Sequence, residues 1–354
     1  MTAPKLRFRE FYNDWLANNL GEVCSHFQSG KSITSKNIND SHGFPVYGGN
    51  GLRGFTDTFT HEGKFVLVGR QGALCGNVNL VDGINYISEH AIAIQANTDN
   101  STDLLAYWLD KMKLNRFSEA SAQPGLAVKK LVKFKIILPT LKEQTKIASF
   151  LSSVDDKIAQ LTQEHELLSE YKKGMMQQLF SQKIRFQADD GSAFEDWKNT
   201  RLGKACSHFQ SGKSITAKDI SDSGSFPVYG GNGLRGFTDQ FTHEGEFILV
   251  GRQGALCGNV NLVDGPNYIS EHAIAIQVNL ENSNKWLAYW LDKMKLNRFS
   301  EASAQPGLAV NKLVRFEINL PQKEEQRKIA NFLSAIDQKI DNVAAQIDQA
   351  KIWK

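Results

Sequence analysis

Long polar side chains stand beside glycines at several points of the sequence. Asn50 and Arg53 lie within residues 49–54, GNGLRG, and Arg70 and Gln71 follow a short apolar run. An arginine can form two hydrogen bonds with guanine, and an asparagine or glutamine can do so with adenine, while glycine lets a backbone come close to a phosphate. These residue types on rigid loops favour recognition of nucleic-acid bases, although each one taken singly is equally explained as a solvated turn residue.

Residues 49–54 also fit the G-x-G-x-x-G pattern of a dinucleotide-binding turn. That turn needs a strand before it and a helix after it, so that the helix N-terminus faces the pyrophosphate. Residues 55–63 instead alternate aromatic with polar side chains and end in glycine, which predicts a strand and a turn. The sequence GKS at residues 30–32 is not a Walker phosphate loop either, because Ser25 stands where such a loop requires glycine. We therefore expect no nucleotide cofactor.

Ser88, Glu89 and His90 could transfer a proton or bind a metal. One imidazole and one carboxylate without further ligands are weak support for either function. We interpret the three residues as a turn that leads into the apolar run HAIAIQ. None of the four cysteines lies in a C-x-x-C pair, so buried thiols in a reducing compartment are favoured over a zinc site. The sequence therefore predicts no metal and no catalytic residue.

The chain is built from two copies of one sequence unit. Position 226 minus position 44 is 182, and residues 20–138 match residues 202–320 at this offset without a gap. Roughly four residues in five are identical, which predicts two copies of one fold and excludes a solenoid of short repeats. The polar loop residues recur at the same offset, so the candidate DNA-contacting residues are Lys31, Tyr47, Asn50, Arg53, Arg70, Gln71, Asn77 and His90, with Lys213, Tyr229, Asn232, Arg235, Arg252, Gln253, Asn259 and His272.

Each copy begins with about 120 residues rich in glycine and in short β-like runs. In the first copy these runs include FPVYG, KFVLVGRQG, NVNLV and HAIAIQ, with turn residues between them. One helix is predicted at residues 104–117, which carry apolar residues at Leu105, Trp108, Leu109 and Met112. This mixture predicts a globular domain of the α/β (α+β) class.

A long amphipathic segment follows each globular part. Apolar residues step by three and four along it with charged residues between them, which is the sequence pattern of a coiled-coil seam. Two such helices can bury their stripes against each other when they pair in antiparallel orientation. The predicted seam comprises Ile147, Leu151, Val154, Ile158, Leu161, Ile329, Leu333, Ile336, Ile340, Val343 and Ile347.

Two globular domains joined by antiparallel helices predict a pseudo-twofold arrangement. The sequence KLRF before the first copy has its counterpart in KIRF before the second, which predicts a circular organisation. The expected divisions are an N-terminal arm at 1–19, a first globular domain at 20–140, a first spacer helix at 141–182, a linker at 183–201, a second globular domain at 202–321 and a second spacer helix at 322–354.

The overall composition is that of a soluble globular protein. No apolar run is long enough to cross a membrane, and no apolar stretch follows the first positive charges, so we expect a cytoplasmic protein. The formal net charge of +3 is well below that of a chain that coats nucleic acid non-specifically. Any DNA-binding charge must therefore be local or shared with partners.

Taken together, these motifs resemble the specificity (S) subunit of type I restriction-modification systems, and the resemblance covers nearly the whole chain. It is carried in each half by SGKSIT, VYGGNGLRGF, VGRQGALCGNV and AQPGLAV. The most specific motif is a proline followed by E-Q-x-K-I-A-x-F-L-x-x-x-D-x-K-I, which occurs at the start of both long helices.

The resemblance implies that each globular part is a target recognition domain for one half of a bipartite DNA site, and that the helices fix the spacing. It implies a non-catalytic subunit that joins two methyltransferase (M) subunits, which use S-adenosylmethionine, and restriction/translocase (R) subunits, which use ATP and Mg. Consistently, the chain carries neither an N-P-P-F/Y tetrad nor a Walker motif.

This chain departs from the usual pattern of the family in two ways. The recognition domains of the family usually diverge, whereas here the copies are nearly the same, so we predict an inverted-repeat target with a fixed gap. The second helix also lacks a stretch that matches residues 174–180, which would weaken docking of the N-terminal arm or of a partner. An uncovered helix seam would also allow the isolated chain to associate with itself.

A function from another class is kept as an alternative. Two β-rich modules on a helical rod could form a scaffold that binds protein or carbohydrate. DNA binding should weaken steeply with added salt because counterions are released, whereas binding of a neutral sugar should not. An enzyme that uses the glycine loop would instead bind NAD or ATP as an isolated chain.

Overall fold

The computed structural model describes residues 4, 6–118, 125–254, 256–300 and 307–354. The chain folds into two compact units: unit 1 contains residues 1–158 and Lys354, and unit 2 contains residues 159–353. The loops around the two AQPG sequences fall largely outside the described residues.

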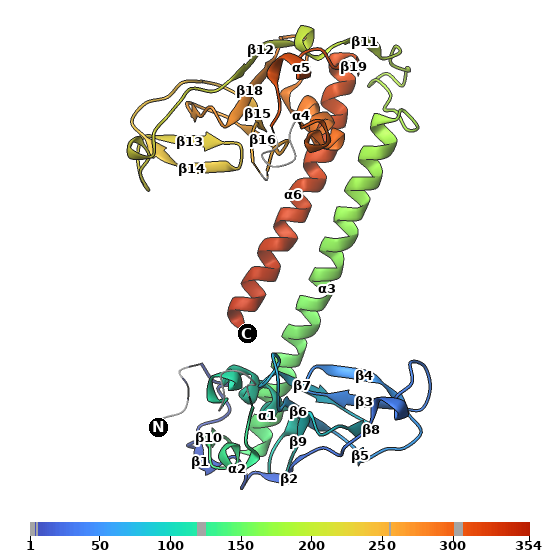
Figure 1. Ribbon diagram of the computed structural model, residues 1–354, viewed down its shortest axis with the longest axis vertical. Helices are drawn as coiled ribbons and strands as arrows, with labels where there is room; N and C mark the ends of the chain where they lie inside the picture. The colour runs from blue at the N-terminus through green and yellow to red at the C-terminus, as the bar shows by residue number, and fades with distance from the viewer. Residues whose placement is uncertain (1–3, 5, 119–124, 255, 301–306) are drawn as a thin grey trace. The chain divides into compact units, whose positions relative to one another are not determined.

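The main sheet of unit 1 is antiparallel, in the order β2 (Cys24–Ser29), β9 (Ala91–Ala96), β6 (Phe65–Gly69) and β7 (Val78–Val81). Every residue of β6 is buried, because the sheet is covered on both faces. Alternate side chains of a strand point to opposite faces. One face of the sheet packs on helix α1 (Thr102–Lys111), and the other packs on a second, smaller sheet (Figure 1).

The smaller sheet has the order β4 (Gly51–Thr56), β3 (Phe44–Gly48), β8 (Ile84–Ile87) and β5 (His61–Glu62). Strands β3 and β4 form an antiparallel hairpin with a register shift at Val46. Strand β3 runs parallel to β8. The segment after GNGLRG therefore continues as strand and turn, as predicted, and the dinucleotide-binding arrangement is excluded.

The sequence predicts one continuous helix at residues 104–117, and this prediction is wrong. Helix α1 spans Thr102–Lys111 and is followed by a separate 3-10 turn, η2 (Leu114–Phe117). The two are divided at Lys113, which has a φ of 50°, in the left-handed region that lysine seldom adopts. Ser101 precedes α1 and caps it, since its side chain accepts a hydrogen bond from the backbone N–H of Leu104.

A two-stranded sheet connects the start of unit 1 to a long helix. Strand β1 (Leu16–Asn19) pairs antiparallel with β10 (Lys135–Leu138), which follows the short helix α2 (Val128–Leu131). Pro139 and Thr140 then lead into α3 (Leu141–Phe180), whose first part belongs to unit 1. A short 3-10 turn, η1, spans Ser35–Asn37.

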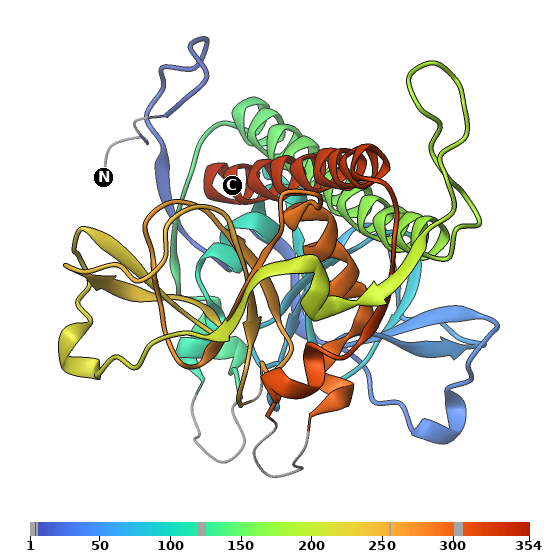
Figure 2. The same cartoon turned by 90° about the horizontal axis from the view of Figure 1, so that it is seen from above.

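Unit 2 repeats these elements. Its main sheet has the order β12-β18-β15-β16, and its smaller sheet the order β14-β13-β17. The hairpin β13–β14 lies on the side of the main sheet away from α4 (Figures 1 and 2). The elements are β11 (Lys198–Arg201), η3 (Leu202–Ala205), β12 (Cys206–Ser211), η4 (Ala217–Asp219), β13 (Phe226–Gly230), β14 (Gly233–Thr238), β15 (Phe247–Gly251), β16 (Val260–Val263), β17 (Tyr268–Ile269), β18 (Ala273–Val278), α4 (Asn284–Met294), η5 (Leu296–Phe299), α5 (Val310–Leu313), β19 (Glu317–Leu320) and α6 (Lys323–Trp353).

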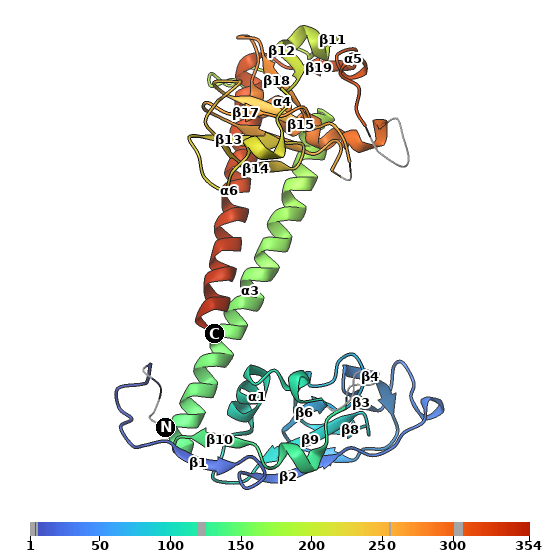
Figure 3. The same ribbon diagram turned by 60° about the vertical axis from the view of Figure 1, so that its left-hand side comes forward.

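Within unit 2, the second part of α3 packs along α6 (Figures 1 and 3). Leu161 packs against Val343 and Ile347. Further along α3, Met176 joins the cluster that contains Ile329, near the start of α6. Residues later in α3 therefore pack against residues earlier in α6. The two helices run antiparallel, which confirms the predicted pairing.

The predicted seam residues differ in how deeply they are buried. Leu161, Ile329, Leu333, Ile336, Val343 and Ile347 are buried in unit 2, and Ile340 is partly buried there. In unit 1, Ile147, Leu151, Val154 and Ile158 are only partly buried. The described helices include none that is long and apolar enough to cross a membrane.

Candidate nucleic-acid interface

Backbone hydrogen bonds bring the predicted loop residues of unit 1 together. The amide of Lys31 donates to the carbonyl of Ile87 at 2.9 Å, and the amide of Glu89 donates to the carbonyl of Lys31 at 3.0 Å. The amide of Ser88 donates to the carbonyl of Tyr47 at 2.8 Å. The segment 88–90 is therefore the turn that was predicted, and it links the loop of Lys31 to the hairpin of Tyr47.

A contact between glycines joins this hairpin to the loop of Arg70. A Cβ atom on Gly49 would lie 2.9 Å from the Cα of Gly69, so neither position has room for a side chain. Next to this contact the amide of Arg70 donates to the carbonyl of His90 at 2.9 Å. The glycines of the two motifs thus allow two backbones to meet, and no phosphate is needed to explain them.

Asn77, Asn50 and Arg53 extend the same cluster. The amide of Gly69 donates to the carbonyl of Asn77 at 2.8 Å. Asn50 lies in the turn between β3 and β4, and the side chain of Arg53 lies against Gly48. We use the name loop cluster 1 for Lys31, Tyr47, Asn50, Arg53, Arg70, Gln71, Asn77 and His90.

The side chains of loop cluster 1 are available to a ligand. Tyr47 and Arg70 are half-buried and the other six are exposed. Within the described residues, the one ion pair made by a side chain of the cluster is that of His90, whose Nε2 lies 3.5 Å from Oε1 of Glu89. Polar side chains that are held at the edge of a sheet and make no hydrogen bond with the described residues are suited to the edges of bases.

Unit 2 contains the same arrangement, which we call loop cluster 2: Lys213, Tyr229, Asn232, Arg235, Arg252, Gln253, Asn259 and His272. The amide of Lys213 donates to Ile269 at 2.8 Å, and that of Arg252 to His272 at 2.9 Å. A Cβ atom on Gly231 would lie 3.0 Å from the Cα of Gly251. The two clusters therefore match in residue type and in backbone geometry.

Basic residues that the prediction left out lie next to loop cluster 1. A Cβ atom on Gly76 would lie 2.4 Å from the amide nitrogen of Asn115, so the loop of Asn77 touches the η2 turn. That turn exposes Lys113 and Arg116. Unit 2 repeats the left-handed lysine at Lys295, with a φ of 49°. Sequence analysis missed this turn because it predicted one continuous helix there.

The sequence predicts buried thiols, and this holds for two of the four cysteines, while Cys24 and Cys206 are partly buried. All four are free, Cys75 and Cys257 are buried, and burial raises the pKa of Cys24 and of Cys206 to about 12. No group of three or more His, Cys, Asp or Glu side chains that could hold a metal ion occurs in the described part of the chain.

In each unit the rings of two histidines are in contact. The rings of His26 and His61 meet edge to face with centroids 5.2 Å apart, and His61 also contacts Phe65. Nδ1 of His61 lies 2.7 Å from the hydroxyl of Thr60, while Nε2 of His26 is buried with no hydrogen-bond partner among the described residues. Burial, followed by the charges of His26 and Lys31, lowers the pKa of His61 to about 4.

We expect this histidine to make unit 1 less stable in mild acid. Its folded-state pKa of about 4 lies below the ordinary value of 6.5, so the unfolded chain binds the extra proton between these values and stability falls as the pH falls through this window. The slope is about 1.4 kcal/mol per pH unit for one fully coupled group. Urea unfolding of the chain and of His61→Asn at pH 7, 6 and 5 measures it. The carboxylates titrate in both proteins, so a difference in the pH dependence reports on His61. If the free energy of unfolding changed with pH by the same amount in both proteins, the expectation would be contradicted.

The sequence matches the family described as type I restriction modification DNA specificity domain twice, at residues 12–170 and 194–351. The chain is 36% identical over 162 residues to the type I restriction enzyme EcoprrI specificity subunit of Escherichia coli, covering 45% of this chain and 40% of that protein. It is 23% identical over 303 residues to the MjaVIII specificity subunit of Methanocaldococcus jannaschii, covering 75% of this chain and 71% of that protein. The match thus spans less than half of the first of these relatives.

The fold is also shared with a solved structure. The crystal structure of the S subunit of a type I restriction-modification system from M. genitalium superimposes with a TM-score of 0.74 at 19% identity, and the match covers 99% of this chain and 96% of that one. Together with the two family matches, which cover most of the sequence, this places the protein: the chain belongs to the type I restriction-modification DNA specificity domain family and contains two copies of that domain.

Proposed function

We propose that the chain is the DNA sequence-reading subunit of a type I restriction-modification complex and has no catalytic activity of its own. The domains at residues 20–140 and 202–321 each read one half of a bipartite site. The observation that carries this proposal is the identity of loop clusters 1 and 2, which hold the same eight residue types on the same backbone hydrogen bonds. Two equal sets of base-contacting groups select the same half-site twice.

The half-sites form an inverted repeat with a fixed gap. Support comes from unit 2, where the second part of α3 runs antiparallel to α6. Two like helices paired in this way are related by a twofold axis, and an inverted repeat in DNA has the same symmetry. The helices at residues 141–182 and 322–354 act as the spacer that fixes the gap.

The same helices dock two methyltransferase subunits, and restriction/translocase subunits join the complex. Support comes from exposed apolar side chains on α3: Leu167 is 58% exposed and Tyr171 is 50% exposed. Such residues on a helix of a soluble protein are typical of a protein interface. S-adenosylmethionine, ATP and Mg are bound by those partners in this proposal.

Selection from a pool of random DNA duplexes with the complete chain tests the proposal. We expect the selected duplexes to contain one half-site twice, in inverted orientation and at one separation. Affinity should fall steeply between 50 mM and 200 mM salt, by an amount that grows with the number of phosphate contacts. Enrichment of two unrelated half-sites, or of none, would contradict the proposal, and affinity unaffected by salt would favour the protein- or carbohydrate-binding scaffold.

A further inference from the structure

The turn after helix α1 contains a lysine in an unfavourable backbone conformation. Lys113 has a φ of 50° and a ψ of 64°, and its twin after α4, Lys295, has a φ of 49° and a ψ of 65°. Helices often end with a residue in this left-handed region, and glycine is the usual choice because a Cβ atom there comes too close to a carbonyl oxygen. Both units therefore hold a lysine where a glycine would be less strained.

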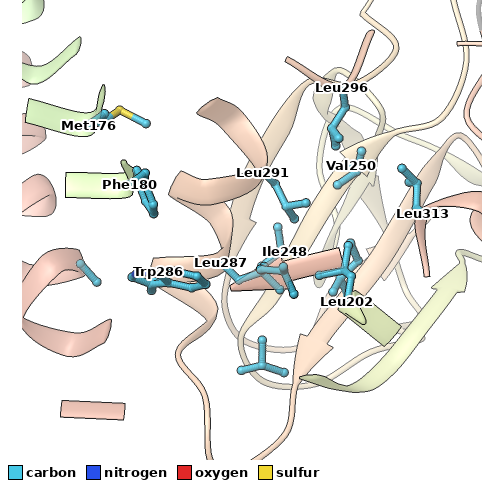
Figure 4. Packing of buried hydrophobic residues seen from close by; sticks show 14 of the residues in the cluster. Met176, Phe180, Leu202, Ile248, Val250, Trp286, Leu287, Leu291, Leu296 and Leu313 are labelled. Atoms are coloured by element: carbon cyan, nitrogen blue, oxygen red, sulfur yellow. The ribbon is translucent and has the colours of Figure 1, made fainter. Parts of the chain in front are cut away.

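The fold requires the left-handed conformation, but it does not require a lysine. The turn brings the next residue back into the core, since Leu114 and Leu296 are both 0% exposed. Figure 4 shows Leu296 in the core near Val250. The lysines themselves face solvent, because the side chain of Lys113 is 72% exposed and that of Lys295 is 71% exposed.

The ion pairs that these lysines make are weak. Nζ of Lys113 lies 3.8 Å from Oδ2 of Asp110, and Nζ of Lys295 lies 3.2 Å from Oδ1 of Asp292. Pairs between side chains that are at least half exposed contribute little to stability, because water and salt screen them. These contacts do not account for the choice of lysine, which points to an interaction outside the chain.

An arginine is held on the same turn. The amide of Arg116 donates to the carbonyl of Lys113 at 3.2 Å. The guanidinium of Arg116 lies over the ring of Phe117, with Cζ 4.7 Å from the centroid, and Arg298 lies over Phe299 at 4.6 Å. Stacking on an aromatic face restricts a guanidinium while its N–H groups can still bind an anion such as phosphate. Each unit thus presents two cations on one short, anchored turn.

Comparison of the two units separates this turn from the rest of the charged surface. At other positions the sign of the charge is reversed: Lys64, Asp103 and Lys135 correspond to Glu246, Lys285 and Glu317. Residues 105–118, by contrast, are identical to residues 287–300. The contact of the turn with a loop of the cluster is also repeated, because a Cβ atom on Gly258 would lie 2.5 Å from the amide nitrogen of Asn297. The cations beside the loop clusters are therefore the same in both units.

We propose that these turns bind phosphates of the DNA backbone and so position the duplex against loop clusters 1 and 2. The contacting residues are Lys113, Arg116, Lys295 and Arg298. Phosphates flank the base edges, so a duplex whose bases reach the loop of Arg70 and Asn77 brings its backbone to the adjacent turn. Phosphate contacts fix the register and orientation of a protein on DNA without reading the sequence. This inference rests on the proposed function, and it supplies local charge to a chain whose formal net charge is +3.

Replacing both left-handed lysines, Lys113→Gly with Lys295→Gly, distinguishes DNA positioning from a role in stability. Glycine relieves the backbone strain, so the variant should unfold at the temperature of the parent or higher. Its affinity for the selected duplex should fall roughly tenfold or more at 50 mM salt, and the slope of log affinity against log salt should decrease by about 2. The ratio of the affinities for the selected and a scrambled duplex should not change, because phosphate contacts carry no sequence information.

Three further variants complete the test. Arg116→Gln with Arg298→Gln should decrease the salt slope by a similar amount. Lys113→Arg with Lys295→Arg should keep the slope of the parent, because the charges remain. Lys64→Ala with Lys285→Ala is the matched control, since it removes one positive charge from each unit at positions where the sign differs between the units. Its slope should stay close to that of the parent.

The outcomes distinguish this inference from the proposed function. A parent chain that binds no DNA would overturn both. A parent that binds DNA with a steep salt dependence would leave the proposed function standing, and the inference alone would then be overturned by any of three results for the glycine variant. These results are a salt slope equal to that of the parent, a lower ratio of selected to scrambled affinity, and a lower unfolding temperature, which would assign the lysines to the fold.

Discussion

Replacing Arg185 by alanine is expected to lower the free energy of unfolding of unit 2 by about 3–5 kcal/mol, the usual cost of removing one partner of a buried ion pair. Its guanidinium donates from Nε and Nη2 to the two carboxylate oxygens of Glu325, at 3.0 Å and 2.9 Å. Trp197 donates to the same carboxylate at 3.0 Å. Glu325 is 0% exposed, so the variant leaves a carboxylate in the interior that keeps, among the described residues, only the hydrogen bond from Trp197 and no counter-charge.

Urea unfolding of unit 2 at pH 7 measures this loss. Combining Arg185→Ala with Glu325→Gln should recover part of the stability, because the neutral amide is less costly to bury than an unpaired carboxylate. Lys198→Ala is the matched control, since Lys198 is 79% exposed and its ion pair with Glu195 lies at the surface. That control should change stability by less than about 1 kcal/mol. Equal losses of unfolding free energy for Arg185→Ala and Lys198→Ala would show that the buried ion pair contributes no more to stability than the surface pair.

The pair also shows where sequence analysis stops. The repeat made the relation of KLRF to KIRF visible, and the same contact does occur in unit 1, where Nε of Arg7 lies 2.6 Å from Oε1 of Glu143. The E-Q motif at the start of each long helix was recognised as specific, but its glutamate lies far from the arginine along the chain. Only the tertiary structure shows that the motif anchors the segment that enters each domain.

Other elements were predictable because their signals are local. The antiparallel helix pair follows from apolar spacing in two long segments, and the strands follow from short apolar runs between turn residues. The break at Lys113 was missed because it depends on a backbone conformation that lysine rarely adopts. The sequence could not predict that the loop residues lie together, because this depends on the parallel pairing of β3 with β8 and on the contact of Gly49 with Gly69.

The second large effect is expected for DNA binding when Arg70 and Arg252 are both replaced by alanine. A bidentate arginine–guanine contact contributes about 1–3 kcal/mol of discrimination, so loss of one in each domain should weaken binding of the selected duplex by roughly 30-fold to 20,000-fold. Both side chains are half-buried on the loop clusters and make no hydrogen bond with the described residues. Their removal should therefore alter affinity while leaving the fold intact.

Lys64→Ala is the matched control for Arg70→Ala because it removes one positive charge from the same domain. Lys64 is paired with Asp103 at 2.9 Å, and its twin in unit 2 is Glu246, so a shared DNA contact cannot depend on it. Titration of the selected duplex and of a scrambled duplex measures both variants. The single variants Arg70→Ala and Arg252→Ala should have equal effects that add in the double variant, because contacts in two separate domains share no partner. A double variant that binds as tightly as Lys64→Ala would show that neither arginine contacts DNA. Unequal effects of the two single variants would show that the two nearly identical domains do not read identical half-sites.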